Sequence, residues 1–257
     1  KVFDAVQKKE IIIPVYLSAG QEYIASTISS FLLYKQQIEK QIFIQHRGHS
    51  TYLAFGGKIE SLIYELLGSS KGCANGMGGS ASLQGKDINL FGHDGLMGSQ
   101  GPIATGACFG NQKFTLCFAG DAAAEEDYFL ASLGWATTKK LPIWYVVEDN
   151  NLSILTEKKV RRSWSMKSVA EGFGMQSFDI DDKPVSIWNA MTKASFDKPA
   201  LFNINTSRLF WHAGAGIDDL NQFDRHKYFI KKYSHLNIEN KAIETINEIW
   251  DQCINNL

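Results

Sequence analysis

Two polar residues that could hold a divalent cation stand directly after two apolar segments. Asp121 follows the run at residues 114–118, and Asn150 follows the run at residues 143–147. A carboxylate, an amide oxygen and a backbone carbonyl form the hard oxygen set that Mg2+ prefers, and phosphate oxygens and water usually complete its shell. The pair therefore predicts a site for Mg2+ and a diphosphate. Taken alone, the same residues fit a turn and a helix cap about equally well.

The segments around these residues predict how they are positioned. Residues 124–138 have the length and pattern of a helix between the two apolar runs, which predicts a βαβ unit with parallel strands and a right-handed crossover. The carboxyl ends of parallel strands meet at one edge of a sheet, where open α/β sheets bind ligands. We therefore expect Asp121 and Asn150 to face one site.

The rest of the chain continues the alternation, so we expect an α/β fold with a mostly parallel sheet and helices on both faces, as a single domain over residues 1–257. The glycine-rich stretch at residues 68–101 is expected to be a ligand-facing loop. The other elements predicted by apolar periodicity are helices at 21–41, 61–67 and 185–195, a helix beginning at Pro102, strands at 175–180 and 200–205, and one or two surface helices from Asp224 to Leu257.

Composition narrows the class of partner. The chain has 257 residues, 44 % of them hydrophobic, and a formal net charge of -1, so it carries no basic field of the kind that attracts nucleic acid or anionic membranes. No apolar run is long enough to span a membrane. The cysteines stand singly, which fits a cytoplasmic location. Because the sequence begins with Lys1 rather than Met, we expect residues to be missing there.

Several short segments, each weak by itself, occur in the fixed order of one known family. The chain resembles the alpha subunits of pyruvate and branched-chain 2-oxo acid dehydrogenase E1 components over about residues 18–219. The matching segments are Gly20-Gln-Glu22, Arg47-x-His49, Gly72-x-x-x-Gly76-x-Gly-Gly-Ser80, Gly95-x-x-Gly-x-Gln100, Gly120-Asp121, Leu141-Pro142, Glu148-Asp-Asn150 and Thr206-x-Arg208 followed by His212.

The resemblance implies that the chain binds thiamine diphosphate and Mg2+. It places Asp121, Asn150 and the carbonyl of Leu152 on the metal. It places Arg47 on the diphosphate, where a guanidinium fork suits phosphate oxygens, and His212 near the diphosphate and the reacting carbon as a catalytic donor. The other cofactor contacts that it implies are His46, Gly95, Met97, Gly120, Ala122 and Ala123.

The resemblance also implies the reaction and the partners. The expected activity is oxidative decarboxylation of a small 2-oxo acid, with thiamine diphosphate carrying the difficult chemistry. A beta-type subunit is expected to supply the glutamate that activates the cofactor, and a lipoyl-bearing acyltransferase is a further candidate partner. We therefore expect the chain alone to be inactive.

Two other functions remain open, the second because the chain departs from the family pattern. Ala122 replaces the second motif glycine, Asp127 adds a negative charge near a helix start close to the expected anion site, and Leu130 stands where a glutamate is frequent. One alternative is a transketolase-type transferase subunit. The other is a cofactor-binding assembly subunit with impaired catalysis.

Two other patterns are set aside. Gly76-x-Gly78 fits the start of a dinucleotide fingerprint but does not directly follow a predicted strand, which that motif requires. His46, His49 and His93 lack the spacing of metal ligands. We expect these histidines at most to line a polar pocket.

Overall fold

The fold is built on a parallel sheet, seen in a computed structural model that describes residues 1–37, 39–213, 218 and 221–257. Six strands follow the order β2-β1-β3-β4-β8-β7, and every neighbouring pair is parallel. The strands of this sheet are β1 (Gln41–Phe43), β2 (Leu90–Phe91), β3 (Thr115–Gly120), β4 (Ile143–Asp149), β7 (Gln176–Asp181) and β8 (Ala200–Asn205). A separate antiparallel hairpin pairs β5 (Leu152–Ser153) with β6 (Thr156–Glu157).

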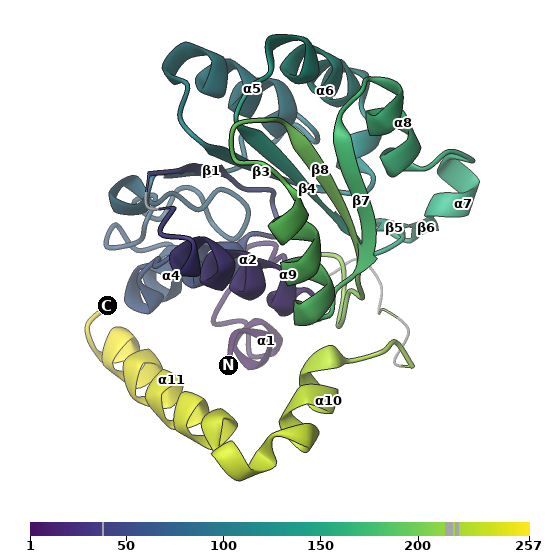
Figure 1. Cartoon of the computed structure of the whole chain (residues 1–257). Coiled ribbons are helices and arrows are strands. Elements are labelled where there is room, and N and C mark those ends of the chain that lie inside the picture. The colour runs from purple at the N-terminus through teal and green to yellow at the C-terminus, as the bar shows by residue number, and fades with distance from the viewer. Residues whose placement is uncertain (38, 214–217, 219–220) are drawn as a thin grey trace.

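Helices cover both faces of the sheet, as predicted (Figure 1). One layer holds α2 (Glu22–Tyr34), α4 (Ile59–Leu66) and α9 (Pro184–Lys193), and the other holds α5 (Gln100–Asn111), α6 (Asp127–Lys139) and α8 (Met166–Gly172). The shorter elements are α1 (Val2–Gln7), α3 (His49–Ala54), α7 (Lys158–Arg161), and the 3-10 turns η1 (Lys86–Ile88) and η2 (Ala123–Glu125).

The central strands alternate between the two cores that these layers enclose. Leu116 and Phe118 of β3 pack with the α2 and α9 layer, whereas Cys117 and Ala119 pack with the α5 and α6 layer. Because both faces are covered, a central parallel strand reads as a continuous apolar run rather than an alternating one. This burial explains why β3 and β4 were visible in the sequence and why their polar ends stand out.

The predicted βαβ unit is confirmed, with corrections elsewhere. β3 and β4 are parallel neighbours joined through α6. The helix predicted at 21–41 is wrong at its end: α2 stops at Tyr34, Gln36 takes a φ of +56°, and Gln41 already begins β1. Ile38, which that prediction used, lies outside the described residues. α5 begins at Gln100, so Pro102 is its third residue; a first-turn proline is tolerated because those N–H groups lack helical partners.

Part of the glycine-rich stretch surrounds one buried carboxylate. Glu65, at the end of α4, is fully buried and accepts hydrogen bonds from four backbone N–H groups at 2.7–3.0 Å. These donors belong to Ala74, Gly76, Gly78 and Gly79. The expectation of a ligand-facing loop therefore fails for this part. The stretch follows α4 rather than a strand, which confirms that it is not a dinucleotide fingerprint.

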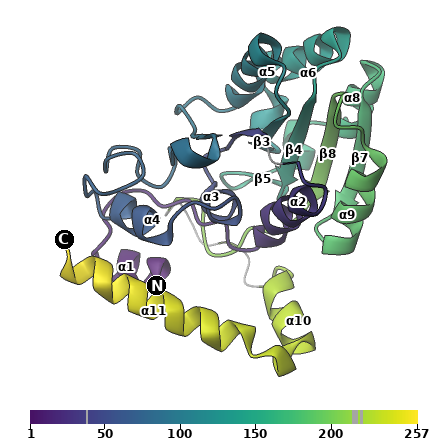
Figure 2. The same cartoon turned by 60° about the vertical axis from the view of Figure 1, so that its left-hand side comes forward.

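The tail forms the predicted surface helices. α10 (Arg225–Lys232) and α11 (Ile238–Asn255), with η3 (Ser234–Leu236) between them, lie outside the sheet layers (Figure 2). Trp250 and Cys253 of α11 are buried and join the core on the α4 side. Among the residues that the structure describes, no helix has the length and apolar character needed to cross a membrane.

Candidate functional site

A cavity of about 450 Å³ lies beyond the carboxyl ends of β1, β3 and β4. This volume falls in the usual range of small-molecule sites. It brings together Asp121 and Asn150, which follow β3 and β4, with Arg47 and His212 from other parts of the chain. The remaining predicted residues that line it are His46, Met97, Gly120, Ala122, Ala123 and Leu152.

One end of the cavity carries the oxygen donors. The Asp121 side chain is 2 % exposed and forms an ion pair with Arg161. The Asn150 amide is held at both atoms, because its Nδ2 donates to Gln21 Oε1 at 2.9 Å and its Oδ1 accepts from the Leu152 N–H at 3.1 Å. A fixed amide oxygen and a buried carboxylate on one cavity wall are donors that fit a divalent cation.

The opposite end of the cavity carries a buried arginine. Arg47 is 2 % exposed, and its guanidinium donates to the Leu17 carbonyl at 2.8 Å. Among the described residues no carboxylate lies within 4 Å of it. Burial and the nearby positive charge of Arg208 lower the pKa of Arg47 to about 10, so it remains charged at neutral pH. An unpaired buried cation facing a cavity is suited to an anion.

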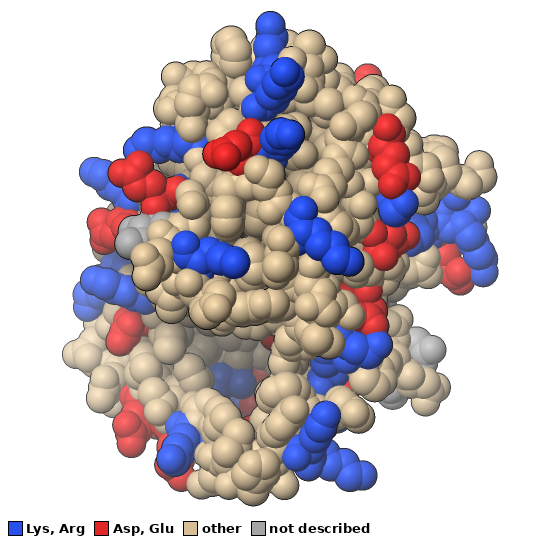
Figure 3. Space-filling view, viewed as in Figure 1, with Lys and Arg blue, Asp and Glu red and all other residues tan. Residues whose placement is uncertain are grey.

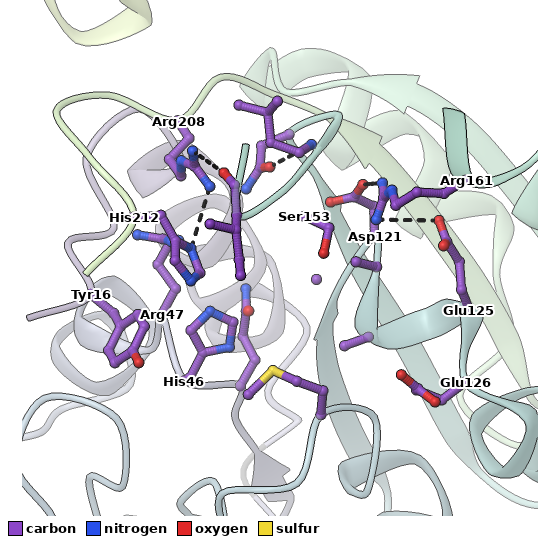
Figure 4. A pocket seen from close by; sticks show the side chains of 18 residues that line it. Tyr16, His46, Arg47, Asp121, Glu125, Glu126, Ser153, Arg161, Arg208 and His212 are labelled. Atoms are coloured by element: carbon purple, nitrogen blue, oxygen red, sulfur yellow. Dashed lines mark hydrogen bonds and ion pairs between the residues drawn. The ribbon is translucent and has the colours of Figure 1, made fainter. Parts of the chain in front are cut away.

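His212 lies against this arginine as a neutral ring. Its Nδ1 is 3.2 Å from Nη2 of Arg47 and 3.4 Å from Nη1 of Arg208 (Figure 4). Burial and the two guanidinium groups lower the pKa of His212 to about 4. Since guanidinium nitrogens only donate, Nδ1 must accept, and the ring proton is assigned to Nε2. His212 can therefore donate a hydrogen bond into the site without carrying charge.

Arg208 differs from Arg47 because its charge is balanced. Its Nε and Nη2 bind the two Asp218 oxygens at 2.8 and 2.5 Å, and Nη2 also donates to the Ile154 carbonyl at 2.7 Å. This paired geometry holds the Arg208 guanidinium in place beside His212. Arg208 was visible in the sequence only as part of a family segment.

Aromatic and thioether side chains line the cavity between its two ends. His46 packs edge-on against Tyr16, with ring centroids 4.9 Å apart. The Met97 side chain lines the cavity, while its carbonyl accepts from the Tyr128 hydroxyl. Gly95, by contrast, is exposed and does not line the cavity. The structure therefore brings Met97 to the site but leaves the contact expected of Gly95 unsupported.

The departures from the family pattern have limited consequences for geometry. Ala122 has a φ of -73°, which any L-residue adopts, so the missing glycine causes no backbone strain there. Asp127 is exposed at the start of α6 and does not line the cavity. The acidic residues that do line it are Glu125 and Glu126. Leu130, in α6, is partly buried and packs against the core between α6 and the sheet.

The cavity also contains residues that the sequence reasoning missed. Gln45 follows β1, whose short length hid it, and Arg161 ends α7 within the run Lys158-Lys-Val-Arg-Arg162. A basic run usually predicts a solvated face, and nothing in the spacing shows which member folds inward. Among the residues described, no group of three or more His, Cys, Asp or Glu side chains is placed to hold a metal ion, and this includes His46, His49 and His93.

The fold is an α/β fold with a cavity at the carboxyl edge of a parallel sheet, with Asp121 and Asn150 at one end and Arg47 at the other. The family model described as dehydrogenase E1 component matches residues 2–244. The chain belongs to this family. The resemblance drawn from the sequence segments is thereby confirmed.

Curated relatives carry the name pyruvate dehydrogenase E1 component subunit alpha. The protein from Rickettsia felis is 30 % identical over 174 residues, which cover 65 % of this chain and 52 % of the relative. That from Porphyra purpurea is 28 % identical over 227 residues, covering 80 % of this chain and 64 % of the relative. The chain thus spans about half the length of the Rickettsia relative.

Solved structures share the fold at low sequence identity. A transketolase from Campylobacter jejuni superposes with a TM-score of 0.53 at 17 % identity, covering 70 % of this chain and 32 % of the other. A protein described as a thiamin diphosphate-dependent enzyme from Mycobacterium smegmatis gives 0.52 at 15 % identity, covering 74 % and 32 %. At these identities the likeness supports the architecture and leaves the reaction open.

Proposed function

We propose that the chain is the alpha-type subunit of a 2-oxo acid dehydrogenase E1 component and holds the diphosphate of thiamine diphosphate together with Mg2+. One observation carries the proposal: the buried Arg47, which has no carboxylate within 4 Å among the residues described, lies in the same cavity as Asp121 and Asn150. An anion bridged to a cation satisfies both ends at once, because the cation needs oxygen ligands and Arg47 needs a negative charge.

Each residue has a distinct task in this proposal. Asp121, Asn150 and the Leu152 carbonyl would ligate Mg2+, and Arg47 would hold the diphosphate. The backbone at Gly120, Ala122 and Ala123 lines the cavity beside them, and Met97 and His46 bound the space for the rings. Gly95 is also proposed as a contact, on the family resemblance alone. The four cysteines are free, which fits the proposed cytoplasmic location.

The bound cofactor supplies a carbon nucleophile for decarboxylation. His212 contributes from this chain as a neutral donor, because its Nδ1 accepts from the arginines and its proton is assigned to Nε2. A neutral imidazole with its proton on Nε2 can donate a hydrogen bond to an oxyanion that develops during the reaction. The carboxyl group that activates the cofactor would come from a beta-type subunit, and a lipoyl-bearing acyltransferase is a proposed acceptor.

The test is a reconstitution with a beta-type chain, for instance one encoded by a neighbouring reading frame. The complex, with Mg2+ and thiamine diphosphate, is assayed on a panel of small 2-oxo acids and on a panel of ketose phosphates. Decarboxylation by the complex and none by the chain alone is expected. Activity only on ketoses would favour the transketolase-type alternative, and cofactor binding without turnover would favour the impaired assembly subunit.

A further inference from the structure

The cation end of the cavity is occupied by a side chain of the protein itself. Arg161, the last residue of α7, reaches over Asp121 and ion-pairs with its carboxylate (Figure 4). A second nitrogen of the same guanidinium, Nη1, lies 3.4 Å from Glu125 Oε1. The Arg161 side chain is 13 % exposed, so it is part of the cavity wall rather than a surface group.

The contacts of Arg161 hold it incompletely. Its Nε and Nη1 are buried and find no hydrogen-bond partner among the described residues. Buried donors without partners carry a free-energy penalty. Charge attraction rather than a complete hydrogen-bond set therefore keeps Arg161 on Asp121. A group held this way can be displaced.

The surrounding charges are balanced while Arg161 is in place. Asp149 pairs with Lys158 and lies 3.8 Å from Arg162, which in turn lies 3.4 Å from Glu125. With Asp121 and Arg161 the network contains three carboxylates and three cations. A divalent cation arriving alone would add two positive charges to this neutral cluster. A diphosphate arriving with it would offset them.

α7 also connects this network to solvent. Lysine and arginine side chains gather on the surface where α7 projects from the body (Figure 3). The Lys159 side chain is 76 % exposed and pairs with Glu157 at 2.7 Å, away from the cavity. Lys159 and Arg161 thus place the same charge on one short helix, with only Arg161 in contact with Asp121.

We propose that Arg161 competes with the divalent cation for the Asp121 carboxylate, which makes tight cation binding depend on the diphosphate. The inference rests on the proposed function, since it assumes that Asp121 is a cation ligand. Two cations at ion-pair distance from one carboxylate repel each other, so the metal can enter only as Arg161 withdraws. Arg161 is therefore an affinity-determining residue for the cation.

The test measures direct binding of Mn2+ to the full chain, with free Mn2+ followed by electron paramagnetic resonance. We expect Arg161→Ala to bind Mn2+ about tenfold more tightly than the wild type when no diphosphate is present. Lys159→Ala, which removes the same charge from the same helix, is expected to change the affinity less than about twofold. With saturating thiamine diphosphate, the difference between Arg161→Ala and the wild type should shrink to less than about threefold.

Further variants separate the competing explanations. Arg161→Gln should repeat the tightening with a side chain of similar length, which covers the case that Arg161→Ala fails to fold. Asp121→Ala should abolish Mn2+ binding, both in the otherwise wild-type chain and in combination with Arg161→Ala. If Arg161→Ala and Arg161→Gln bind no more tightly than the wild type while Asp121→Ala still abolishes binding, the competition is overturned and the cation site stands. If Mn2+ binds to no variant, or binds independently of Asp121, the proposed cation site fails as well.

Discussion

The two ends of the cavity handle buried charge in opposite ways. At one end Arg47 is buried without a carboxylate within 4 Å among the described residues. At the other end Asp121 is equally buried but already paired with Arg161. A buried charge without an ion-pair partner lowers the stability of the fold but is free to bind a ligand. A buried charge in an ion pair binds a ligand only after its protein partner is displaced. The anion end is thus preorganised and the cation end is closed by the protein.

The largest effect is expected from Arg47→Met. Removing the guanidinium should weaken thiamine diphosphate binding by about 100-fold, because the anion end loses its charged fork. The free energy of unfolding should stay the same or rise, since an unpaired buried charge disappears. Calorimetric titration and urea denaturation measure the two quantities. Arg47→Lys keeps the charge and should lose less affinity, and equal losses in both variants would contradict the account.

A smaller effect, of opposite sign in stability, is expected from Asp121→Ala. Without Asp121, the only charged partner left to the buried Arg161 among the described residues is Glu125 at 3.4 Å, so the free energy of unfolding should fall by about 2 kcal/mol. Urea denaturation checks this value. Asp127→Ala, an exposed carboxylate at the start of α6, should stay within about 0.5 kcal/mol of the wild type. If Asp121→Ala were as stable as the wild type, the ion pair between Asp121 and Arg161 would not stabilise the folded chain.

The pH dependence of stability tests the histidine at the anion end. The folded protein lowers the pKa of His212 from 6.5 to about 4. Between those values the unfolded chain binds a proton that the folded chain does not, so stability falls as pH drops below about 6.5. Allowing for half-burial, His212→Gln should lose about 1 kcal/mol less than the wild type between about pH 7 and 5. Urea denaturation at both pH values measures this difference. If the wild type and His212→Gln lost the same free energy of unfolding, His212 would not be held neutral by the fold.

The smallest effect is expected from Asp127→Asn. The sequence placed this charge near the anion site, but the structure places it on an exposed helix start outside the cavity. Thiamine diphosphate affinity should therefore change by less than about twofold. The same titration as for Arg47→Met measures it. A large gain in affinity would mean that the charge acts on the site despite its exposure.

The parts of the site that lie after long buried strands could be predicted from sequence. β3 and β4 are covered on both faces, so their apolar runs were clear, and Asp121 and Asn150 marked their ends. β1 and β2 have only three and two residues, too short for a periodic signal. The helix prediction accordingly ran across the turn at Gln36 into β1.

The roles that could not be predicted from the sequence depend on contacts between residues far apart in the chain. Arg161 lies forty residues from Asp121, and no local pattern distinguishes it from the solvated Lys159. Likewise, the glycines around residue 76 were expected to face a ligand, yet they wrap Glu65 because a buried carboxylate needs several donors. In both cases the partner in space, rather than the residue type, decides the role.

We propose that this cavity binds a diphosphate through Arg47 and a divalent cation through Asp121. The most direct measurement is a calorimetric titration of the chain, co-purified with a beta-type partner, with thiamine diphosphate in the presence and absence of Mg2+. We expect saturable, Mg2+-dependent binding of thiamine diphosphate, and an affinity at least about 100-fold weaker for thiamine, which lacks the phosphates. Binding of thiamine and thiamine diphosphate with equal affinity, or binding unaffected by Mg2+, would contradict it.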